Sequence, residues 1–203
     1  PTYEAIDPVR FIGNHSSGKM GFSLAQHALS LGAKVNLITG PTHLEVHHAQ
    51  LNRINVISAQ DMFEATTSCY DTSDIVIASA AVSDYKPKHQ FDKKIKKSEN
   101  SLRIELEPTP DILKYLGDHK THQILVGFAL ETDDEEANAK SKLERKNLDF
   151  IVLNSLNDPG AGFKIETNTI KIITKSEILR FDTKSKPEVA KDIVDQILKS
   201  HLR

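Results

Sequence analysis

The chain has 203 residues, 38% of them hydrophobic and 27% charged, with a formal net charge of −2. This composition is typical of a globular protein, and the weak net charge excludes a global field that would recruit nucleic acid or a membrane surface. We therefore expect a single domain over residues 1–203, with no nucleic-acid or membrane partner. The one cysteine, Cys69, excludes an internal disulfide and favours a reducing compartment such as the cytoplasm. No stretch approaches the roughly 20 apolar residues of a membrane span.

Segments whose apolar residues recur at helical spacing alternate along the chain with short, continuous runs of apolar residues. Gly32 predicts the end of the first helix, Ser58 can cap the second, and Thr109 with Pro110 predicts a third helix start. The predicted helices are residues 20–31, 61–69, a segment from 109, 133–146 and 187–198. The predicted strands are residues 35–38, 56–57, 75–78, 102–106, 124–128 and 149–153, followed by a C-terminal β-hairpin of 169–174 with 177–182. This alternation predicts an α/β fold with a Rossmann-like, doubly wound, mostly parallel sheet and helices on both faces.

Residues 7–21 combine glycines, serines and cationic side chains immediately before the first predicted helix. Gly18 permits tight backbone geometry, and the hydroxyls of Ser16 and Ser17 can cap the helix. The N–H groups of a helix start suit an anion such as phosphate, and nearby cations such as Arg10 add positive charge. We interpret Ser16, Ser17 and Gly18 as a candidate phosphate cradle.

Three interpretations of this segment stay open from the residues alone. A P-loop needs a hydroxyl residue where Met20 stands, and a dinucleotide fingerprint needs a Gly-x-Gly spacing that is absent. An ordinary capped turn accounts for the glycines and serines but not for Asn14. Asn14 could be a left-handed turn residue or a hydrogen-bond donor directed at a reacting carbonyl.

Residues 7–21 resemble the signature of the phosphopantothenoylcysteine synthetase family, the CoaB domain that is often fused behind a flavin-dependent decarboxylase. The resemblance continues to about Lys199. It implies a ligase of coenzyme A biosynthesis that joins 4′-phosphopantothenate and L-cysteine through an acyl-cytidylate, using CTP and Mg²⁺. It also implies a homodimer whose sites take residues from both subunits. The family has a buried strand just upstream that residues 1–7 do not supply, so we expect a fragment of a longer bifunctional chain with a decarboxylase domain upstream.

A run of small residues follows the predicted strand 75–78, where open α/β sheets bind ligands. Ala78, Ser79 and Ala80 would let a nucleotide lie against the backbone, and Asp84 could bind a ribose hydroxyl or a water-bound Mg²⁺. A small-residue turn with Asp84 as a helix cap is the alternative. The resemblance implies that this run lines the nucleotide pocket.

Residues 86–100 are polar and rich in lysine, which predicts a flexible flap. Such a charge run is commonly a solvated surface, and a nucleic-acid patch would need interleaved aromatic residues that are absent. The resemblance implies that Lys94 closes over the triphosphate and the acyl intermediate.

Lys142 and Lys146 share one helical face, and none of the positions one turn from Lys142 is acidic. The pair could therefore hold an anion, or could be ordinary surface charge. Phe128 alone would be assigned to the core. The resemblance implies nucleotide binding by all three residues and CTP binding by four residues that otherwise look like a helix start: Pro110, Asp111, Ile112 and Leu113.

The resemblance also assigns catalytic roles. Asn14 would hold the acyl group and polarise its carbonyl, Arg10 would grip a phosphopantothenate oxygen, and Lys94 would act from the flap. The histidines near Glu45 match no standard metal spacing, so we expect loop histidines and no metal ligands there. The alternatives are an NAD(P)-dependent Rossmann oxidoreductase and a non-catalytic nucleotide- or RNA-binding module.

Overall fold

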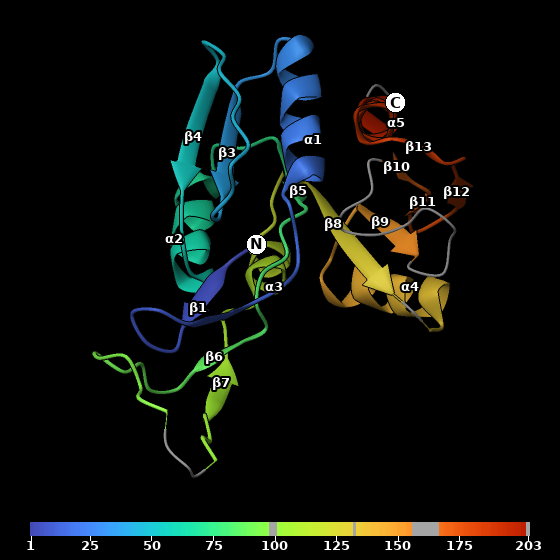
Figure 1. Ribbon diagram of the computed structural model, residues 1–203. Helices are drawn as coiled ribbons and strands as arrows, with labels where there is room; N and C mark the ends of the chain where they lie inside the picture. Colours follow the sequence, from blue (N-terminus) through green and yellow to red (C-terminus); the bar gives the residue numbers. More distant parts are fainter. Residues whose placement is uncertain (98–100, 132, 156–166, 202–203) are drawn as a thin grey trace.

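The computed structural model describes residues 1–97, 101–131, 133–155 and 167–201 (Figure 1). The helices are α1 Lys19–Ser30, α2 Ala59–Tyr70, α3 Ile112–Asp118, α4 Glu135–Arg145 and α5 Lys186–His201. The strands are β1 Tyr3–Ala5, β2 Phe11–Gly13, β3 Val35–Thr39, β4 Leu51–Asn55, β5 Ile75–Ala78, β6 Tyr85–Pro87, β7 Leu106–Pro108, β8 Ile124–Glu131, β9 Phe150–Ser155, β10 Thr167–Asn168, β11 Ile170–Ile173, β12 Ile178–Arg180 and β13 Lys184–Ser185. None of the helices in these ranges is long and apolar enough to cross a membrane.

The largest sheet is mixed and has the strand order β12-β11-β9-β8-β5. β5, β8 and β9 are parallel, whereas β11 is antiparallel to both β9 and β12. The α/β class and the C-terminal hairpin of β11 with β12 are thus confirmed. The doubly wound, mostly parallel arrangement stays a prediction, because β3 and β4 form a separate parallel pair.

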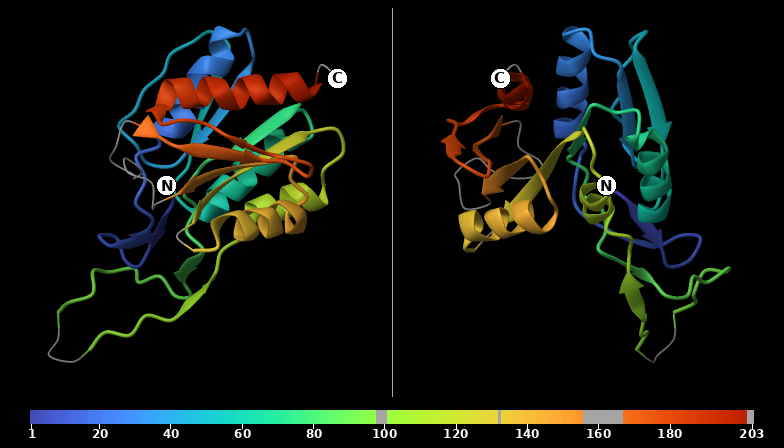
Figure 2. Two further views of the ribbon diagram at one scale, coloured as in Figure 1. Left: turned by 90° about the vertical axis from the view of Figure 1, so that its right-hand side faces the viewer. Right: turned by 180° about the vertical axis from the view of Figure 1, so that it is seen from behind.

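Helices cover both faces of the large sheet because successive residues of its central strands point to opposite sides. Val126 of β8 packs in a core with residues of α1 and α5, whereas its neighbour Leu125 packs in a second core with residues of α2, α3 and α4. Figure 2 shows α5 and α4 on opposite sides of the strands. The fold therefore has two cores, one on each face of the sheet.

Two small antiparallel hairpins, β1–β2 and β6–β7, lie beyond the carboxyl end of β5. The flap predicted at residues 86–100 leaves β6 and projects away from the body of the molecule (Figure 2). Residues 98–100 lie outside the described part of the chain.

Several predicted boundaries were wrong for local reasons. The strand expected at residues 56–57 is β4, Leu51–Asn55, in which only Leu51 and Ile54 are apolar. The strand expected at 102–106 is the shorter β7. The helix expected from Thr109 and Pro110 begins at Ile112, because the Asp111 carboxylate caps it by accepting from the Lys114 N–H at 3.0 Å. Residues 3–5 form β1, outside the large sheet.

Candidate functional site

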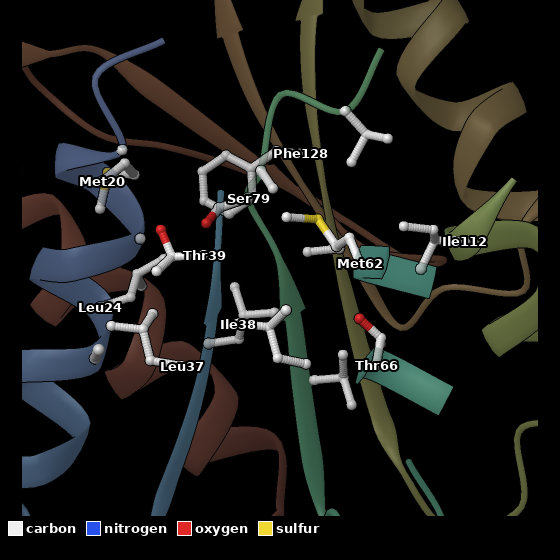
Figure 3. A pocket seen from close by; sticks show the side chains of 18 of the residues that line it. Met20, Leu24, Leu37, Ile38, Thr39, Met62, Thr66, Ser79, Ile112 and Phe128 are labelled. Carbon is white, nitrogen blue, oxygen red and sulfur yellow. The ribbon is translucent and has the colours of Figure 1, made fainter. Parts of the chain in front are cut away.

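A cleft of about 1890 Å³ runs along β3 and β5 and opens where β5 and β8 end. The predicted site residues in its lining come from five separate segments of the chain. The predicted site residues that line it are Asn14, Ser16, Ser17, Gly18, Ala78, Ser79, Ala80, Asp84, Pro110, Asp111, Ile112, Leu113, Phe128, Lys142 and Lys146. Figure 3 shows Ser79 and Phe128 at one end of this cleft, with apolar side chains deeper inside it. The cleft has space for a nucleotide and for a second substrate.

The first segment is the start of α1, where Gly18 adopts a left-handed conformation with φ of 78°. Gly18 is the N-cap, and no side chain caps the helix, so the capping role predicted for Ser16 and Ser17 was wrong. The two hydroxyls instead accept from the N–H groups two residues later, at 3.3 and 3.4 Å. Apart from the Lys19 N–H, which donates to the Ser17 hydroxyl, the first turn of α1 has no side-chain cap at the cleft, which suits an anion.

A close approach joins this turn to the second segment. A Cβ atom on Gly21 would lie 3.1 Å from the Ser79 hydroxyl oxygen. The Asn14 side-chain amide donates to the Val82 carbonyl at 2.9 Å. Because Asn14 and Ser79 lie far apart in sequence, these contacts fix the loop before α1 against the loop after β5.

Lys142 of α4 and Lys146, the C-cap of that helix, form a cationic wall of the cleft. The Lys142 ammonium donates to the Phe128 carbonyl at 2.8 Å. Lys146, whose side chain is only 14% exposed, forms an ion pair with Asp111, which is 55% exposed. Burial raises the pKa of the Asp111 carboxyl, but the hydrogen bond from Lys146 and the charge of Lys142 outweigh it, so the pKa lies below its ordinary value. This wall can therefore receive a phosphate oxygen beside an acid that stays ionised.

Arg10 and Lys94 do not line the cleft. The Arg10 guanidinium forms an ion pair with the buried Asp7 carboxylate and donates to the Ile95 carbonyl at 3.0 Å. The same carboxylate accepts from the Ile95 N–H at 3.1 Å, and Lys94 is exposed beside this contact. Asp7 and Arg10 thus hold the base of the flap against the β1–β2 hairpin.

Asp7 is a residue that our sequence analysis missed. Its hydrogen bond to Arg10, assisted by N–H groups of the turn and of Ile95, keeps the pKa of its carboxyl far below the ordinary value. The Asp-Pro pair followed by Arg10 was the available signal, because Asp commonly accepts from N–H groups two and three residues later in a turn.

The carboxylates that line the cleft include Asp84, which is exposed at its rim, and Asp111. Within the described ranges, no three His, Cys, Asp or Glu side chains lie close enough to form a protein-only metal cage. Mg²⁺ commonly binds through one or two carboxylates together with substrate phosphates, so these residues fit Mg²⁺ that arrives with a triphosphate.

Comparison with known proteins gives consistent matches over nearly the whole chain. The family model of the DNA/pantothenate metabolism flavoprotein C-terminal domain matches residues 1–201. The coenzyme A biosynthesis bifunctional protein CoaBC of Bacillus subtilis (strain 168) is 50% identical over 198 residues, which are 97% of this chain and 49% of that protein. A cysteine/cysteine sulfinic acid decarboxylase of an unknown prokaryotic organism is 54% identical over 200 residues, 98% of this chain and 56% of that protein. The chain thus spans about half the length of the curated relatives it matches.

A solved structure has the same fold. The crystal structure of the C-terminal domain of the coenzyme A biosynthesis bifunctional protein CoaBC matches with a TM-score of 0.82 at 42% identity, covering 97% of this chain and 89% of that one. The mixed sheet and its covering helices are therefore the architecture of this C-terminal domain.

Proposed function

Because this chain belongs to the family of DNA/pantothenate metabolism flavoprotein C-terminal domains, we propose that it is a phosphopantothenate–cysteine ligase of coenzyme A biosynthesis. The observation that carries the proposal is the convergence of five distant segments on one cleft that is cationic on one wall and has a helix start at its rim. The nucleotide would be CTP, as the sequence resemblance implies. The whole protein would carry a decarboxylase domain in a longer bifunctional chain.

The cleft residues supply a place for each part of CTP. The small residues after β5 offer a flat surface for the nucleoside, and Asp84 can accept from a ribose hydroxyl. The start of α1 and the lysines Lys142 and Lys146, which line the cleft, would face the triphosphate. Mg²⁺ bound through Asp84 and the phosphate oxygens would neutralise the triphosphate charge. Phe128 and the residues before α3 would enclose the remaining side of the nucleotide.

The reaction has two displacement steps. The carboxylate of 4′-phosphopantothenate attacks the α-phosphorus of CTP, forming the acyl-cytidylate while the bond to the β-phosphate breaks and pyrophosphate leaves. The amine of cysteine then attacks the acyl carbon, so that an amide forms, the acyl–oxygen bond breaks, CMP leaves and the nitrogen gives up one proton to solvent. CMP is a far better leaving group than the oxide ion that an unactivated carboxylate would have to expel. Asn14 would donate to the acyl oxygen as negative charge develops on it.

Arg10 is proposed to grip a phosphopantothenate oxygen from the β1–β2 turn, and Lys94 to act from the flap. Since both lie outside the cleft, the flap would close over a site, in the same subunit or across a homodimer. Closure would exclude water from the acyl-cytidylate, which hydrolysis would otherwise consume. Anchoring by Asp7 keeps Arg10 and the flap together during this movement.

The test is product analysis with CTP, Mg²⁺, 4′-phosphopantothenate and cysteine, carried out on the longest natural chain that contains this sequence. We expect pyrophosphate without cysteine, and CMP with phosphopantothenoyl-cysteine after its addition. Asn14→Asp removes the donor and should lower the rate of CMP release by roughly 10²–10³. Asn55→Asp, at an exposed position of β4 that does not line the cleft, is the matched control. A full rate for Asn14→Asp would contradict its role, and absence of CMP from the unaltered chain would contradict the ligase itself.

A further inference from the structure

The loop that follows β5 is held from one side by a hydroxyl group that the proposed mechanism does not use. The Ser83 N–H donates to the Thr2 hydroxyl at 3.0 Å, and the Thr2 N–H donates to the Ala81 carbonyl at 3.3 Å. Thr2 thus bonds to the residues immediately before and after Val82. Thr2 is completely buried and Ser83 is only 3% exposed, so water does not replace this hydroxyl as the acceptor.

Thr109, which precedes α3, holds the same loop from another side. Its hydroxyl donates to the Ser83 carbonyl at 2.6 Å, and its N–H donates to the Asp84 carbonyl at 3.0 Å. Because Ala81 is bonded as well, the chain is fixed on both sides of the peptide group that joins Val82 to Ser83. The orientation of this one peptide group then depends on the partners of its own N–H and C=O.

The two ends of this peptide group bond to different side chains. Its N–H is that of Ser83, which donates to Thr2, and its C=O is that of Val82. The Val82 carbonyl accepts from the Asn14 side-chain amide at 2.9 Å. A trans peptide group is planar, so its N–H and C=O point in opposite directions and turn together. The Thr2 hydroxyl therefore fixes the direction of the Val82 carbonyl.

The Val82 carbonyl in turn fixes the Asn14 carboxamide. A carbonyl oxygen only accepts, so this contact places the amide nitrogen of Asn14, rather than its oxygen, toward the loop. The nitrogen carries two hydrogens, and Val82 takes one of them. The plane of the carboxamide then sets the direction of the second hydrogen, which is the one available to an acyl oxygen. Thr2 precedes β1 and Asn14 follows β2, so antiparallel pairing puts both at the same end of the hairpin.

We propose that Thr2 is a positioning residue for Asn14 and acts through the peptide group between Val82 and Ser83. The inference rests on the proposed ligase function, in which Asn14 polarises the acyl carbonyl. Thr2 does not line the cleft, so it would touch neither CTP nor the acyl intermediate. Without its hydroxyl, the buried Ser83 N–H would lose its acceptor, and the peptide group would turn toward another. The Val82 carbonyl would turn with it and leave Asn14 without a fixed direction.

The test uses the longest natural chain that contains this sequence. Thr2→Val keeps the size of the side chain and removes the hydroxyl, whereas Thr2→Ser keeps the hydroxyl. We expect Thr2→Val to lower kcat for CMP release by roughly tenfold, because small displacements of a catalytic group cost up to about 10² in rate. The Kd for CTP should change little, because Thr2 bonds to none of the residues proposed to bind it. Thr2→Ser should restore most of the rate.

Thr67→Val is the matched control, because it removes a hydroxyl that donates to the Phe63 carbonyl within α2 at 3.0 Å. This variant should keep the full rate of CMP release. A loss in Thr67→Val as large as that in Thr2→Val would show that removal of any such hydroxyl slows the enzyme, and would overturn the proposal.

A double-mutant cycle separates positioning of Asn14 from a general effect on the fold. In the Asn14→Asp protein, which has lost the donor, adding Thr2→Val should lower the rate of CMP release by less than about twofold, because residues that act as a unit are not additive. An equal loss in both backgrounds, or a full rate for Thr2→Val alone, would overturn the proposal. If Thr2→Val does not fold, Thr2→Cys takes its place in the cycle, since a thiol is only a weak acceptor.

Hydrogen exchange tests the same bonds without turnover, so its result is distinct from failure of the ligase function. Followed by mass spectrometry, exchange at the Ser83 N–H should be faster in Thr2→Val than in the unaltered protein, and unchanged in Thr2→Ser. Unchanged exchange in Thr2→Val would overturn the proposal even if CMP release falls. Absence of CMP from the unaltered chain would contradict the ligase itself, whatever the exchange result.

Discussion

At the scale of single residues, Asp7 is the most consequential side chain outside the cleft, because one carboxylate holds Arg10, its own turn and the flap. We expect Asp7→Asn to lower the free energy of unfolding and to loosen the flap at Ile95. Since the Asp7 pKa is lowered in the folded protein, its contribution is present above the ordinary value of 3.8 and is lost as the pH falls below it. The difference in stability between the two proteins should therefore shrink below about pH 4.

Urea unfolding between about pH 3 and 7 measures this difference, and Asp92→Asn, exposed on the flap, is the control. A difference that grows as the pH falls would contradict the assigned sign. The rate of tryptic cleavage after the flap lysines reports separately on anchoring, and should rise in Asp7→Asn but not in Asp92→Asn.

Residue-scale signals were readable from sequence where their cause is local. Ser58 forms a capping box with Asp61, and Gly32 takes a left-handed conformation after α1, both as the pattern indicates. The local turn of Asp7 with Arg10 had a readable signal, whereas its bond to Ile95, which lies 88 residues away, had none. Arg10 and Lys94 were grouped with the cleft residues by resemblance, and no spacing pattern could show that both lie outside the cleft. Contacts between distant segments decide these positions.

At the scale of elements, the packing of α3 against the end of α4 sets the position of Lys146. A Cβ atom on Gly117 of α3 would lie 2.0 Å from the Lys146 carbonyl oxygen, which is too close without movement of one helix. Gly117→Ala gains helix propensity of about 1 kcal/mol, but overpacking of this kind costs typically 1–3 kcal/mol. We expect net destabilisation and separation of Lys146 from Asp111.

Urea unfolding and CTP titration together check this prediction. If Gly117→Ala lowers both the stability and the CTP affinity, the helix contact positions the cationic wall as proposed. A variant of higher stability with unchanged CTP affinity would show that α3 and α4 can shift without consequence.

The start of α3 was predicted incorrectly from the sequence. This helix begins two residues later than the Thr-Pro signal suggested, because Asp111 caps it.

The strands were predicted correctly only where the local sequence pattern is apolar. The strands β5, β8 and β9 are apolar runs and were predicted in place, although β5 is only partly buried. β4 was missed because only Leu51 and Ile54 of its residues are apolar, and its place beside β3 comes from pairing that a local pattern does not encode. The mixed order of the large sheet depends likewise on β11 meeting β9 in the antiparallel sense.

At the scale of the whole molecule, ligand binding to the assembled cleft should raise the thermal stability of the protein, because the five segments meet only in the folded state. CTP with Mg²⁺ at a free concentration of about 100 Kd contributes roughly 2.7 kcal/mol, which in a domain of this size raises Tm by roughly 5–11 °C. NADH and a single-stranded RNA should leave Tm unchanged. Thermal unfolding by circular dichroism, with each ligand in parallel, separates the ligase from the two alternative functions.

A matched pair of lysine variants locates the bound nucleotide. Lys142→Met removes a cation of the cleft wall and should abolish most of the rise in Tm that CTP causes. Lys140→Met, two residues earlier on the exposed side of α4, should retain that rise. An equal rise in Tm in both variants would place CTP elsewhere on the molecule. A shift with NADH alone would favour the oxidoreductase, and one with RNA alone would favour a binding module. Only a Lys142-dependent rise in Tm with CTP agrees with the proposed position of the phosphates between the start of α1 and the end of α4.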